Sequence, residues 1–245
     1  MDLELKGKNV LIVGGSKGIG LSIVKSFIKE GAITHVISRG DINFSNKDMF
    51  HYKADASDHE SMKSIKEKIS NKTKGKLDIV ISNIGKGSGS KKPIDIKEWN
   101  SSWATNFITG LNTASVFENL LRVNKGVLIF ISSIAGIEEI GAPTVYSSAK
   151  AGLIAFSKSL SHKLAPEIRV NVVAPGNIWF EGGTWDIKQK EDPEAITDML
   201  NQKVPLERFG TTQEVADIVL FVSSSKASFI TGGCFVIDGG QTINF

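Results

Sequence analysis

The chain has 245 residues, 41% of them hydrophobic, which is enough to bury a sizeable core and is a normal length for one α/β unit. Its net charge is only +3 and its basic residues are scattered, which excludes an electrostatic footprint for nucleic acid. Cys234 is the only cysteine, so an intrachain disulfide and a zinc–thiolate cluster are excluded. The acidic N-terminus reaches an apolar run of only four residues, Val10 to Val13, so we expect no signal peptide or membrane anchor and predict a soluble, cytoplasmic protein.

Short apolar runs alternate with longer amphipathic runs along the whole chain. This order is typical of a parallel sheet with helices on both faces, whose strands are continuous Val/Ile/Leu runs. No composition change marks a second domain, so we predict one doubly wound α/β domain over residues 1–245 with a seven-stranded, mostly parallel sheet. The expected strands are Asn9–Val13, Thr34–Ser38, Phe50–Lys53, Asp78–Ser82, Val127–Ser132, Arg169–Val173 and Cys234–Ile237. The expected helices are Gly18–Glu30, His59–Ser70, Ile96–Arg122, Val145–Leu164 and Gln213–Ser223.

The first strand runs directly into the glycine-rich sequence Gly14-Gly15-Ser16-Lys17-Gly18-Ile19-Gly20 and then into an amphipathic helix. Strand, glycine turn and helix in this order form the context that phosphate binding requires. Glycines allow a tight turn and a close approach of a pyrophosphate, and the helix N-terminus offers unpaired N–H groups. The alternative is a glycine-rich turn that binds no ligand.

Three connections depart from the regular alternation. The 11-residue step from Arg39 to Phe50 is too short for a crossover helix with its loops, so we expect an irregular connection there. Residues 86–93 are rich in Gly, Ser and Lys, and a long polar segment covers about 176–201. Both segments follow strands at their carboxyl ends, where open α/β sheets bind ligands. We predict that both are mobile and that the second is the substrate loop.

Tyr146 and Lys150 stand four residues apart in a predicted helix. Four residues rise about 6 Å and make just over one turn, so both side chains leave the same face. A nearby ammonium favours the phenolate, and lowering a tyrosine pKa from about 10 to about 7 takes roughly 4 kcal/mol. Such a tyrosine is an acid–base group near neutral pH. In this lysine-rich chain the spacing also arises by chance, so the pair alone does not decide the function.

The spacing Gly14-x-x-x-Gly18-x-Gly20 resembles the cofactor turn of the short-chain dehydrogenases/reductases, and further motifs of that family follow in order. Ser133 lies 13 residues before Tyr146 at the end of the fifth expected strand, and Asn106 lies on the helix after the fourth. The other matches are Asp55-Ala56, Asn83 in Ser82-Asn83-Ile84-Gly85, Pro175-Gly176 and Asp238-Gly239-Gly240. The resemblance to the single-domain members implies a Rossmann-type fold and hydride transfer between a nicotinamide cofactor and a ketone or secondary alcohol.

The resemblance also assigns roles to four side chains. Tyr146 is the general acid or base, and Ser133 donates a hydrogen bond to the substrate oxygen. Lys150 lowers the tyrosine pKa and binds the nicotinamide ribose, while Asn106 holds a water that links Lys150 to solvent. The plainer alternatives are a serine that caps a strand end and a buried, helix-bending asparagine. The hydride itself belongs to the cofactor.

The expected cofactor is NADP(H), with NAD(H) as the alternative, and no metal is expected. Enzymes that use NAD usually carry an acid at the end of the second strand. Here Ser38 and Arg39 occupy that place and Lys17 lies in the turn, so cations and a hydroxyl favour a 2′-phosphate, unless both cations are ordinary surface charges. Asp41, two residues past Arg39, is expected to be the only nearby acid. The expected cofactor residues are Gly14, Ser16, Lys17, Gly18, Ile19, Gly20, Ser38, Arg39, Asp55, Ala56, Asn83, Gly85, Tyr146, Lys150, Pro175, Gly176 and Ile178.

Three positions depart from the family pattern. Val13 stands where the family usually has threonine, and Ser82 replaces an asparagine. Phe180 stands where the family often has the threonine that binds the nicotinamide carboxamide. We therefore expect the cofactor to be oriented by backbone groups such as those of Ile178, or by Thr184.

The substrate pocket is expected between residues 85–93, 134–144 and 176–201. Trp179, Phe180 and Trp185 favour an apolar or ring-bearing substrate, or they pack their segment onto the body of the protein. Lys86, Lys91 and Lys92 attract an anionic group or are simply solvated. The best interpretation is a 3-oxoacyl thioester or another small carbonyl, with a sugar or ring alcohol as the alternative.

Two other classes of protein are possible on the same fold. A non-catalytic cofactor-binding regulator would be expected to lack Ser133, Tyr146 or Lys150, and all three are present. A nucleotide-sugar epimerase or dehydratase would carry a sizeable C-terminal substrate domain, which we do not expect in a chain that stops five residues after Gly240. The resemblance implies a homotetramer or homodimer, formed by the two long central helices and the last strand, with no nucleic-acid or membrane partner.

Overall fold

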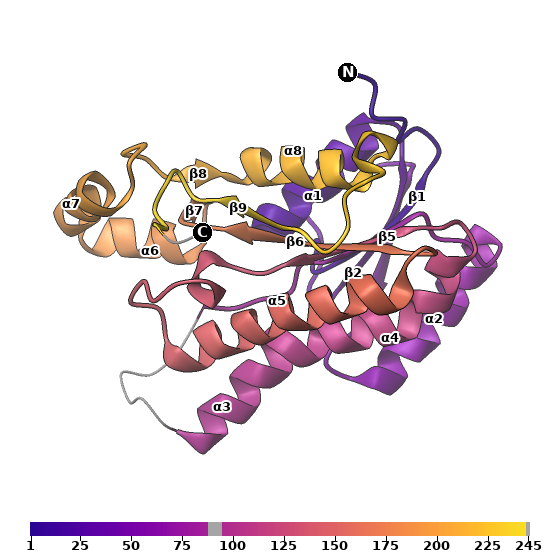
Figure 1. Cartoon of the computed structure of the whole chain (residues 1–245), viewed down its shortest axis with the longest axis horizontal. Coiled ribbons are helices and arrows are strands. Elements are labelled where there is room, and N and C mark those ends of the chain that lie inside the picture. The colour runs from indigo at the N-terminus through magenta and orange to yellow at the C-terminus, as the bar shows by residue number, and fades with distance from the viewer. Residues whose placement is uncertain (88–94, 244–245) are drawn as a thin grey trace.

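In the computed structural model, which describes residues 1–87 and 95–243, seven parallel strands form the centre of the molecule (Figure 1). Their order across the sheet is β3-β2-β1-β4-β5-β6-β9. This confirms the predicted doubly wound, Rossmann-type α/β fold. The strands are β1 (Asn9–Val13), β2 (Ile33–Ser38), β3 (Met49–Lys53), β4 (Ile79–Ser82), β5 (Val127–Ile131), β6 (Arg169–Pro175) and β9 (Cys234–Ile237).

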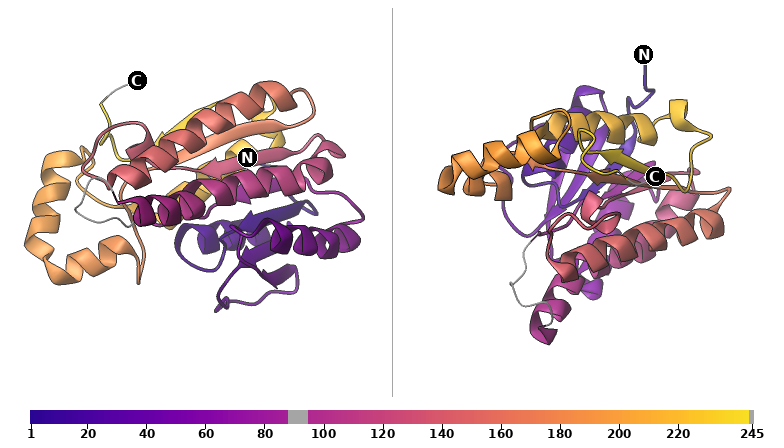
Figure 2. Two further views of the ribbon diagram at one scale, coloured as in Figure 1. Left: turned by 90° about the horizontal axis from the view of Figure 1, so that it is seen from below. Right: turned by 60° about the vertical axis from the view of Figure 1, so that its left-hand side comes forward.

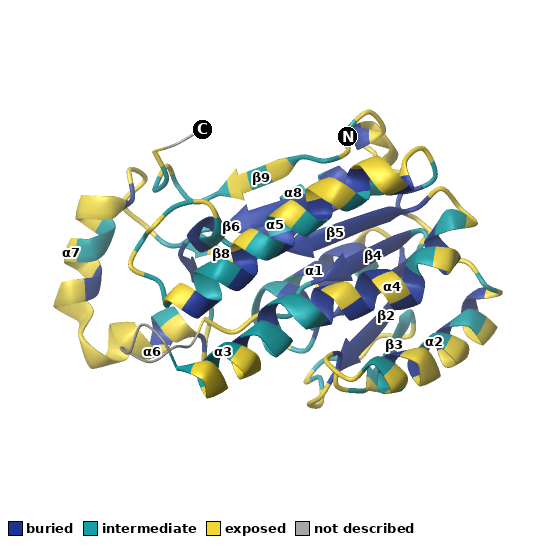
Figure 3. Cartoon of the chain, turned by 60° about the horizontal axis from the view of Figure 1, so that its bottom comes forward, coloured by how far each residue is buried: buried dark blue, intermediate teal, exposed yellow. Residues whose placement is uncertain are grey.

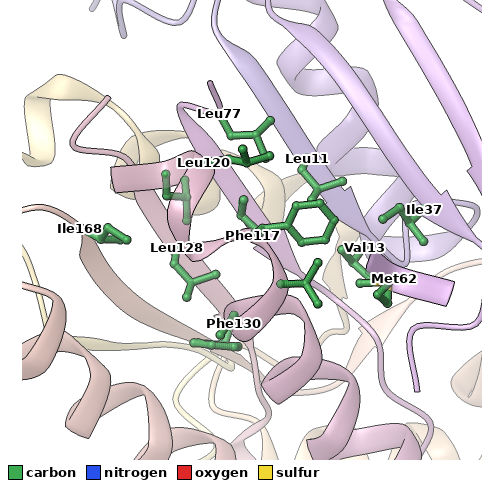
Figure 4. Packing of buried hydrophobic residues seen from close by; sticks show 14 of the residues in the cluster. Leu11, Val13, Ile37, Met62, Leu77, Phe117, Leu120, Leu128, Phe130 and Ile168 are labelled. Atoms are coloured by element: carbon green, nitrogen blue, oxygen red, sulfur yellow. The ribbon is translucent and has the colours of Figure 1, made fainter. Parts of the chain in front are cut away.

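Helices cover both faces of this sheet because both faces are apolar. Along β1, Val10 and Ile12 pack toward α1 (Gly18–Lys29) and α8 (Thr212–Ser223), whereas Leu11 and Val13 pack toward the opposite layer. That second layer contains α2 (His59–Thr73), α4 (Thr109–Arg122) and α5 (Thr144–Leu164). Figure 3 shows the central strands β4, β5 and β6 buried between the layers, whereas the edge strand β9 is partly exposed. Figure 4 shows the apolar side chains of the layer that contains α4, packed around Phe117.

The strand order reverses beside β1, and this places the glycine turn next to the loop after β4. From β1 the chain continues to β2 and β3 on one side, and β4 then returns to the other side of β1. Val13 and Ser82 are paired at the carboxyl ends of these two strands. Such a switch point leaves a crevice where open α/β sheets bind ligands. Arg39 to Asp48 contains no helix, which confirms the irregular connection expected there.

The helix predicted over Ile96–Arg122 is three consecutive pieces. α3 (Ile96–Trp103) leads into a π-helical turn, Ala104–Ile108, and α4 follows. Asn106, one of the predicted catalytic residues, lies in that turn. Single π turns are frequent at functional sites, since the extra residue changes where a side chain is placed.

The segment predicted as a substrate loop is mostly helical. It contains the short strand β7 (Ile178–Trp179), α6 (Thr184–Glu191) and α7 (Pro193–Lys203), and β7 pairs with β8 (Gly210–Thr211). Figure 2 shows α6 and α7, in orange, projecting beyond the carboxyl edge of the sheet in both views. Asp192 accepts a hydrogen bond from Ala195 N and so caps α7. The predicted mobility of this segment stays a prediction.

Two expectations fall partly outside the described residues. These are the mobility of residues 86–93 and the attraction of an anion by Lys91 and Lys92, because residues 88–94 are not described. In the part of the chain that is described, no helix is long and apolar enough to cross a membrane.

Candidate active site

Two of the four predicted catalytic side chains, those of Lys150 and Asn106, lie against Gly85 in the loop after β4, and Tyr146 and Ser133 lie beside Lys150. A methyl carbon placed at Gly85 would lie 2.7 Å from Nζ of Lys150 and 3.3 Å from Oδ1 of Asn106. Nζ of Lys150 lies 5.8 Å from the ring centre of Tyr146, and the Tyr146 hydroxyl is hydrogen-bonded to the side chain of Ser133. The predicted group is therefore assembled from three separate segments: the loop after β5, α5 and the π turn.

Two contacts hold α5 against the end of β5. The Ser132 hydroxyl, at the end of β5, donates to the backbone oxygen of Lys150 at 2.9 Å. A methyl carbon at Gly136 would lie 2.6 Å from the carbonyl carbon of Lys150 and 2.7 Å from Ala151 N, so only glycine permits this approach. The loop that carries Ser133 is thereby fixed to the helix turn that carries Lys150. Sequence reasoning did not assign Ser132 or Gly136 any role.

Lys150 is a buried amine with one hydrogen-bond acceptor among the described residues. Its side chain is 2% exposed, and Nζ donates to the backbone oxygen of Ile131 at 3.0 Å. Burial without a carboxylate partner disfavours the ammonium and lowers the pKa of Lys150 to about 8. One N–H therefore serves to position the amine, and no described residue accepts a hydrogen bond from the other two.

The environment of Tyr146 differs from the expectation. Burial raises the pKa of its phenol above the ordinary value, and the hydrogen bond with Ser133 opposes that shift. The prediction that Lys150 lowers this pKa toward neutrality is wrong for this structure. The physical reason is that desolvation of the phenolate outweighs a lysine that is directed to the Ile131 carbonyl. Tyr146 is therefore protonated at neutral pH.

Ser133 also acts as a local cap, as the plainer alternative predicted. Its Oγ accepts a hydrogen bond from Ala135 N at 3.2 Å, at the start of a 3₁₀ turn, Ile134–Gly136. Because this bond uses an oxygen lone pair, it leaves the hydroxyl proton available for donation to Tyr146 or to a substrate oxygen. The capping interpretation and the catalytic interpretation are thus compatible.

Asn106 is 1% exposed, and its side chain is fully hydrogen-bonded. Its Oδ1 accepts from Lys86 N at 2.9 Å, and Nδ2 donates to the backbone oxygen and hydroxyl of Ser102 at 3.0 and 3.1 Å. The Trp103, Phe107 and Phe156 rings pack in series with centres 5.0 and 5.7 Å apart and hold the π turn against α5. Asn106 therefore joins the loop after β4 to the π turn, and its predicted role in holding a water stays a prediction.

One cavity of about 590 Å³ lies beside this group, a size typical of small-molecule sites. The predicted cofactor residues in its lining are Gly14, Ser16, Lys17, Ile19, Ser38, Arg39, Asp55, Ala56, Asn83 and Gly85. The structure adds residues that sequence reasoning did not assign to the cofactor: Gly40, Asp41, Ala54, Ser57, Ile84, Thr105, Thr109 and Phe180. The predicted cofactor residues Gly18, Gly20, Tyr146, Lys150, Pro175, Gly176 and Ile178 lie outside this lining. Ile178 instead lines a separate cavity of about 90 Å³.

The glycine turn is held in place by the loop after β4. Gly14 has a φ of +91°, a backbone conformation that favours glycine, and its oxygen accepts from Asn83 Nδ2 at 2.8 Å. Asn83 N donates to the backbone oxygen of Val13 at 2.9 Å. No side chain caps α1 at Lys17, so the first N–H groups of this helix are left for an anion.

The far end of the cavity carries charges of both signs. The buried Ser38 hydroxyl lies 2.9 Å from the backbone oxygen of Gly40 and 2.8 Å from Nε2 of His51. Arg39 pairs with Asp55 at 3.8 Å, and Lys53 pairs with Asp41 at 2.6 Å. The hydrogen bond from Lys53 lowers the pKa of Asp41. Asp41 is thus not the only acid near Arg39, because β3 brings Asp55 to the same edge.

Comparisons with known proteins place this arrangement in a family. The family model described as "Enoyl-(Acyl carrier protein) reductase" matches residues 13–242. A 3-oxoacyl-[acyl-carrier-protein] reductase of Chlamydia pneumoniae is 32% identical over 99% of this chain and all of its own length. A tropinone reductase homologue of Arabidopsis thaliana is 33% identical over 98% of this chain and 93% of its own. The chain belongs to the short-chain dehydrogenases/reductases. It is a member of an oxidoreductase family.

Solved structures agree with the family and the fold. The aldohexose dehydrogenase of Thermoplasma acidophilum superposes with a TM-score of 0.87 at 27% identity, covering 100% of this chain and 98% of its own. A short chain dehydrogenase from Leptospira borgpetersenii with bound NAD⁺ also has a TM-score of 0.87, at 28% identity, covering 97% and 94% of the two chains.

Members of the short-chain dehydrogenase/reductase family bind a nicotinamide dinucleotide, and the residues of this chain fit one. The uncapped first turn of α1 suits a diphosphate, the cavity has a suitable volume, and Gly85 leaves space for Lys150 at its edge. Of the three aromatic residues left open by the sequence, Trp185 packs against Phe209 with ring centres 5.5 Å apart, whereas Phe180 lines the cavity. Trp179 is 39% exposed on β7.

Proposed function

We propose that this short-chain dehydrogenase/reductase transfers hydride reversibly between NADP(H) and a ketone or secondary alcohol, with Tyr146 as the general acid and base. The observation that carries the proposal is the hydrogen-bonded pair of Tyr146 and Ser133, with Lys150 and Asn106 around Gly85, beside a cavity that begins at the glycine turn. Family membership supports the class of reaction.

Each of three side chains has a separate role in the proposed reaction. A bound nicotinamide supplies or accepts the hydride. In the direction of reduction, Tyr146 donates its phenol proton to the substrate oxygen, and the Ser133 hydroxyl turns its proton from Tyr146 to the same oxygen. Burial raises the pKa of Tyr146, so the phenol carries the proton that this step needs. Lys150 binds the cofactor ribose with the N–H groups that Ile131 does not use.

The preference for NADP(H) is supported by the charges at the far end of the cavity. Arg39, Lys17 and the Ser38 hydroxyl line it, and β2 ends without a carboxylate. Asp41 is neutralised by Lys53 at 2.6 Å, which weakens its repulsion of a 2′-phosphate. NAD(H) is the second candidate, because the Asp41 carboxylate lines the same cavity and offers an acceptor for ribose hydroxyls.

For the substrate we propose a 3-oxoacyl thioester or another small carbonyl. The 3-oxoacyl-[acyl-carrier-protein] reductases among the relatives support this class, and the aldohexose dehydrogenase structure supports a sugar alcohol as the alternative. A cytoplasmic location and a homotetramer or homodimer remain predictions from the sequence.

A panel of carbonyl compounds with both cofactors tests the proposal. It contains 3-oxoacyl thioesters, keto-sugars, quinones and steroid ketones, each followed at the absorbance band of the reduced nicotinamide. We expect turnover with at least one compound and a higher kcat/KM with NADPH than with NADH. No turnover on any compound, together with no binding of either cofactor, would contradict the proposed function.

A further inference from the structure

The ring of Phe180 lies directly on the glycine turn. A methyl carbon placed at Gly18 would lie 2.8, 2.9 and 3.0 Å from Cζ, Cε2 and Cε1 of Phe180. Gly18 is the first residue of α1, and Phe180 lines the same cavity as Ser16, Lys17 and Ile19. The tip of an apolar ring therefore covers the backbone at the start of the helix that faces the cavity.

The backbone on both sides holds Phe180 in this place. Before it, β7 pairs with β8 through Ile178 and Trp179. After it, Gly183 N donates to the backbone oxygen of Phe180 at 2.9 Å and closes a turn in which Gly182 has a φ of +72°. A methyl carbon at Gly183 would also lie 2.9 Å from the Phe180 ring, so the ring is fitted between two glycines.

Asp186 fixes this turn to α6. Asp186 is 4% exposed, and its Oδ2 accepts hydrogen bonds from Gly182 N and from Nζ of Lys190, both at 2.8 Å. The carboxylate is buried, so its hydrogen bond with Gly182 N is shielded from water, whereas Lys190 is an exposed partner that adds less. The position of Phe180 therefore results from defined contacts.

We propose that Phe180 is an affinity-determining plug of the cofactor cavity. With its ring on Gly18 it covers the N–H groups at the start of α1, and it offers no hydrogen bond in return. The dinucleotide binds only when the ring and the turn of residues 180–183 leave Gly18. This inference rests on the proposed function, which places a diphosphate at that helix start.

The plug lowers the apparent affinity without changing the contacts of the bound state. A protein that binds only from a minor conformation has its affinity reduced by the population of that conformation. Minor conformations are typically populated at ~10% or less, so removing the ring is expected to tighten binding by about tenfold or more. Opening also precedes binding, so the observed association rate of the wild type reaches a plateau at high cofactor concentration.

Four variants of the full chain test the plug, with dissociation constants from calorimetry and association rates from stopped-flow fluorescence. Phe180→Ala and Phe180→Thr are expected to tighten NADPH about tenfold and to remove the plateau. Asp186→Asn loosens the anchor but keeps the ring, so it is expected to raise the plateau rate. Phe229→Ala removes the same ring from a fully exposed position and is expected to change nothing.

Adenosine 2′-monophosphate is the internal control, because it carries no diphosphate and is expected to bind wild type and variants equally. Equal or weaker binding of NADPH by Phe180→Ala, with a correctly folded protein by circular dichroism, overturns the plug and leaves the proposed function intact. If Phe180→Ala does not fold, an unchanged plateau rate in Asp186→Asn overturns it. Failure of wild type and every variant to bind either dinucleotide overturns the proposed function and the plug together.

Discussion

The two ends of the cavity differ in how far their polar and charged side chains are exposed to solvent. At the catalytic end, Lys150 and Asn106 are 2% and 1% exposed and are held by backbone partners. At the far end, the side chains of Arg39 and Asp41 are 76% and 85% exposed and belong to surface ion pairs. Buried polar groups act strongly because little solvent screens them, whereas exposed charges are each worth little. Single substitutions should therefore have large effects at the first end and small effects at the second.

The largest effect is expected at Tyr146. Tyr146→Phe removes the proton that the substrate oxygen receives, and loss of a general acid lowers kcat by about 10²–10⁴-fold. The NADPH dissociation constant, measured by calorimetry, should barely change. Tyr52→Phe is the matched control, because Tyr52 is the other tyrosine and its hydroxyl contacts His35 on β2 at 3.2 Å. A Tyr146→Phe enzyme with substantial remaining activity would refute the mechanism.

The buried ammonium of Lys150 is expected to reduce the free energy of unfolding of the protein. Its pKa is about 8 in the folded chain, against an ordinary value of 10.5, so the buried ammonium is unfavourable below pH 8. Lys150→Met should abolish turnover, weaken NADPH, and raise the unfolding free energy by about 3 kcal/mol at pH 7.

The sign of the pH dependence distinguishes this cause from better packing. Between about pH 8 and 10.5 the unfolded wild type holds a proton that the folded protein has lost, so wild-type stability rises with pH. The advantage of Lys150→Met in urea unfolding should therefore shrink across this range. Lys158→Met serves as the control, since Nζ of Lys158 donates to Gly232 O at an exposed site on the same helix and its removal should give no gain.

A smaller effect is expected at Arg39. Arg39→Ala should weaken NADPH by about three- to tenfold and leave NADH nearly unchanged, because an exposed cation contributes modestly to binding a 2′-phosphate. Arg39→Lys keeps the charge and should recover part of the loss. Equal effects on both cofactors in fluorescence titrations would refute the NADP(H) assignment.

The smallest effect is expected at Asp41. Asp41→Asn removes a negative charge beside the proposed 2′-phosphate, and should tighten NADPH by about two- to threefold at low salt and less at high salt. A strong loss of NADH affinity in the same variant would instead identify Asp41 as the acceptor for ribose hydroxyls and reverse the cofactor preference.

The central strands of the seven-stranded sheet could be predicted from sequence because burial on both faces leaves continuous apolar runs such as Val10 to Val13, whereas the two-residue strands β7 and β8 were not predicted. The π turn could not, because the apolar residues of Ile96–Arg122 also fit one regular helix. The extra residue is accommodated by tertiary contacts of Asn106 with Ser102 and Lys86. α6 and α7 were not predicted, because neither shows the apolar periodicity of a helix that packs on a core. Asp186 in α6 and Ile196 in α7 are their only described buried residues. The sequence Asp192-Pro193 was the start signal that should have been used.

For the candidate site, too, some features could be predicted from the sequence and others could not. The identities of Ser133, Tyr146 and Lys150 follow from ordered motifs, and the structure brings them together. Their pKa values do not follow, because burial is decided by the whole fold: the phenol of Tyr146 is shifted upward, opposite to the expectation from Lys150 alone. The pairing of Arg39 with Asp55 likewise depends on the register of β2 and β3, which local sequence does not contain.

The position of the Lys150 amine depends on Gly85 having no Cβ atom. A single methyl group at Gly85 would stand 2.7 Å from Nζ and would push the amine away from the Ile131 carbonyl. Such a change alters no charge, no hydrogen-bonding group and none of the four predicted catalytic side chains. The smallest residue of the site therefore determines where its buried cation lies, and a search for catalytic side chains alone would pass over it.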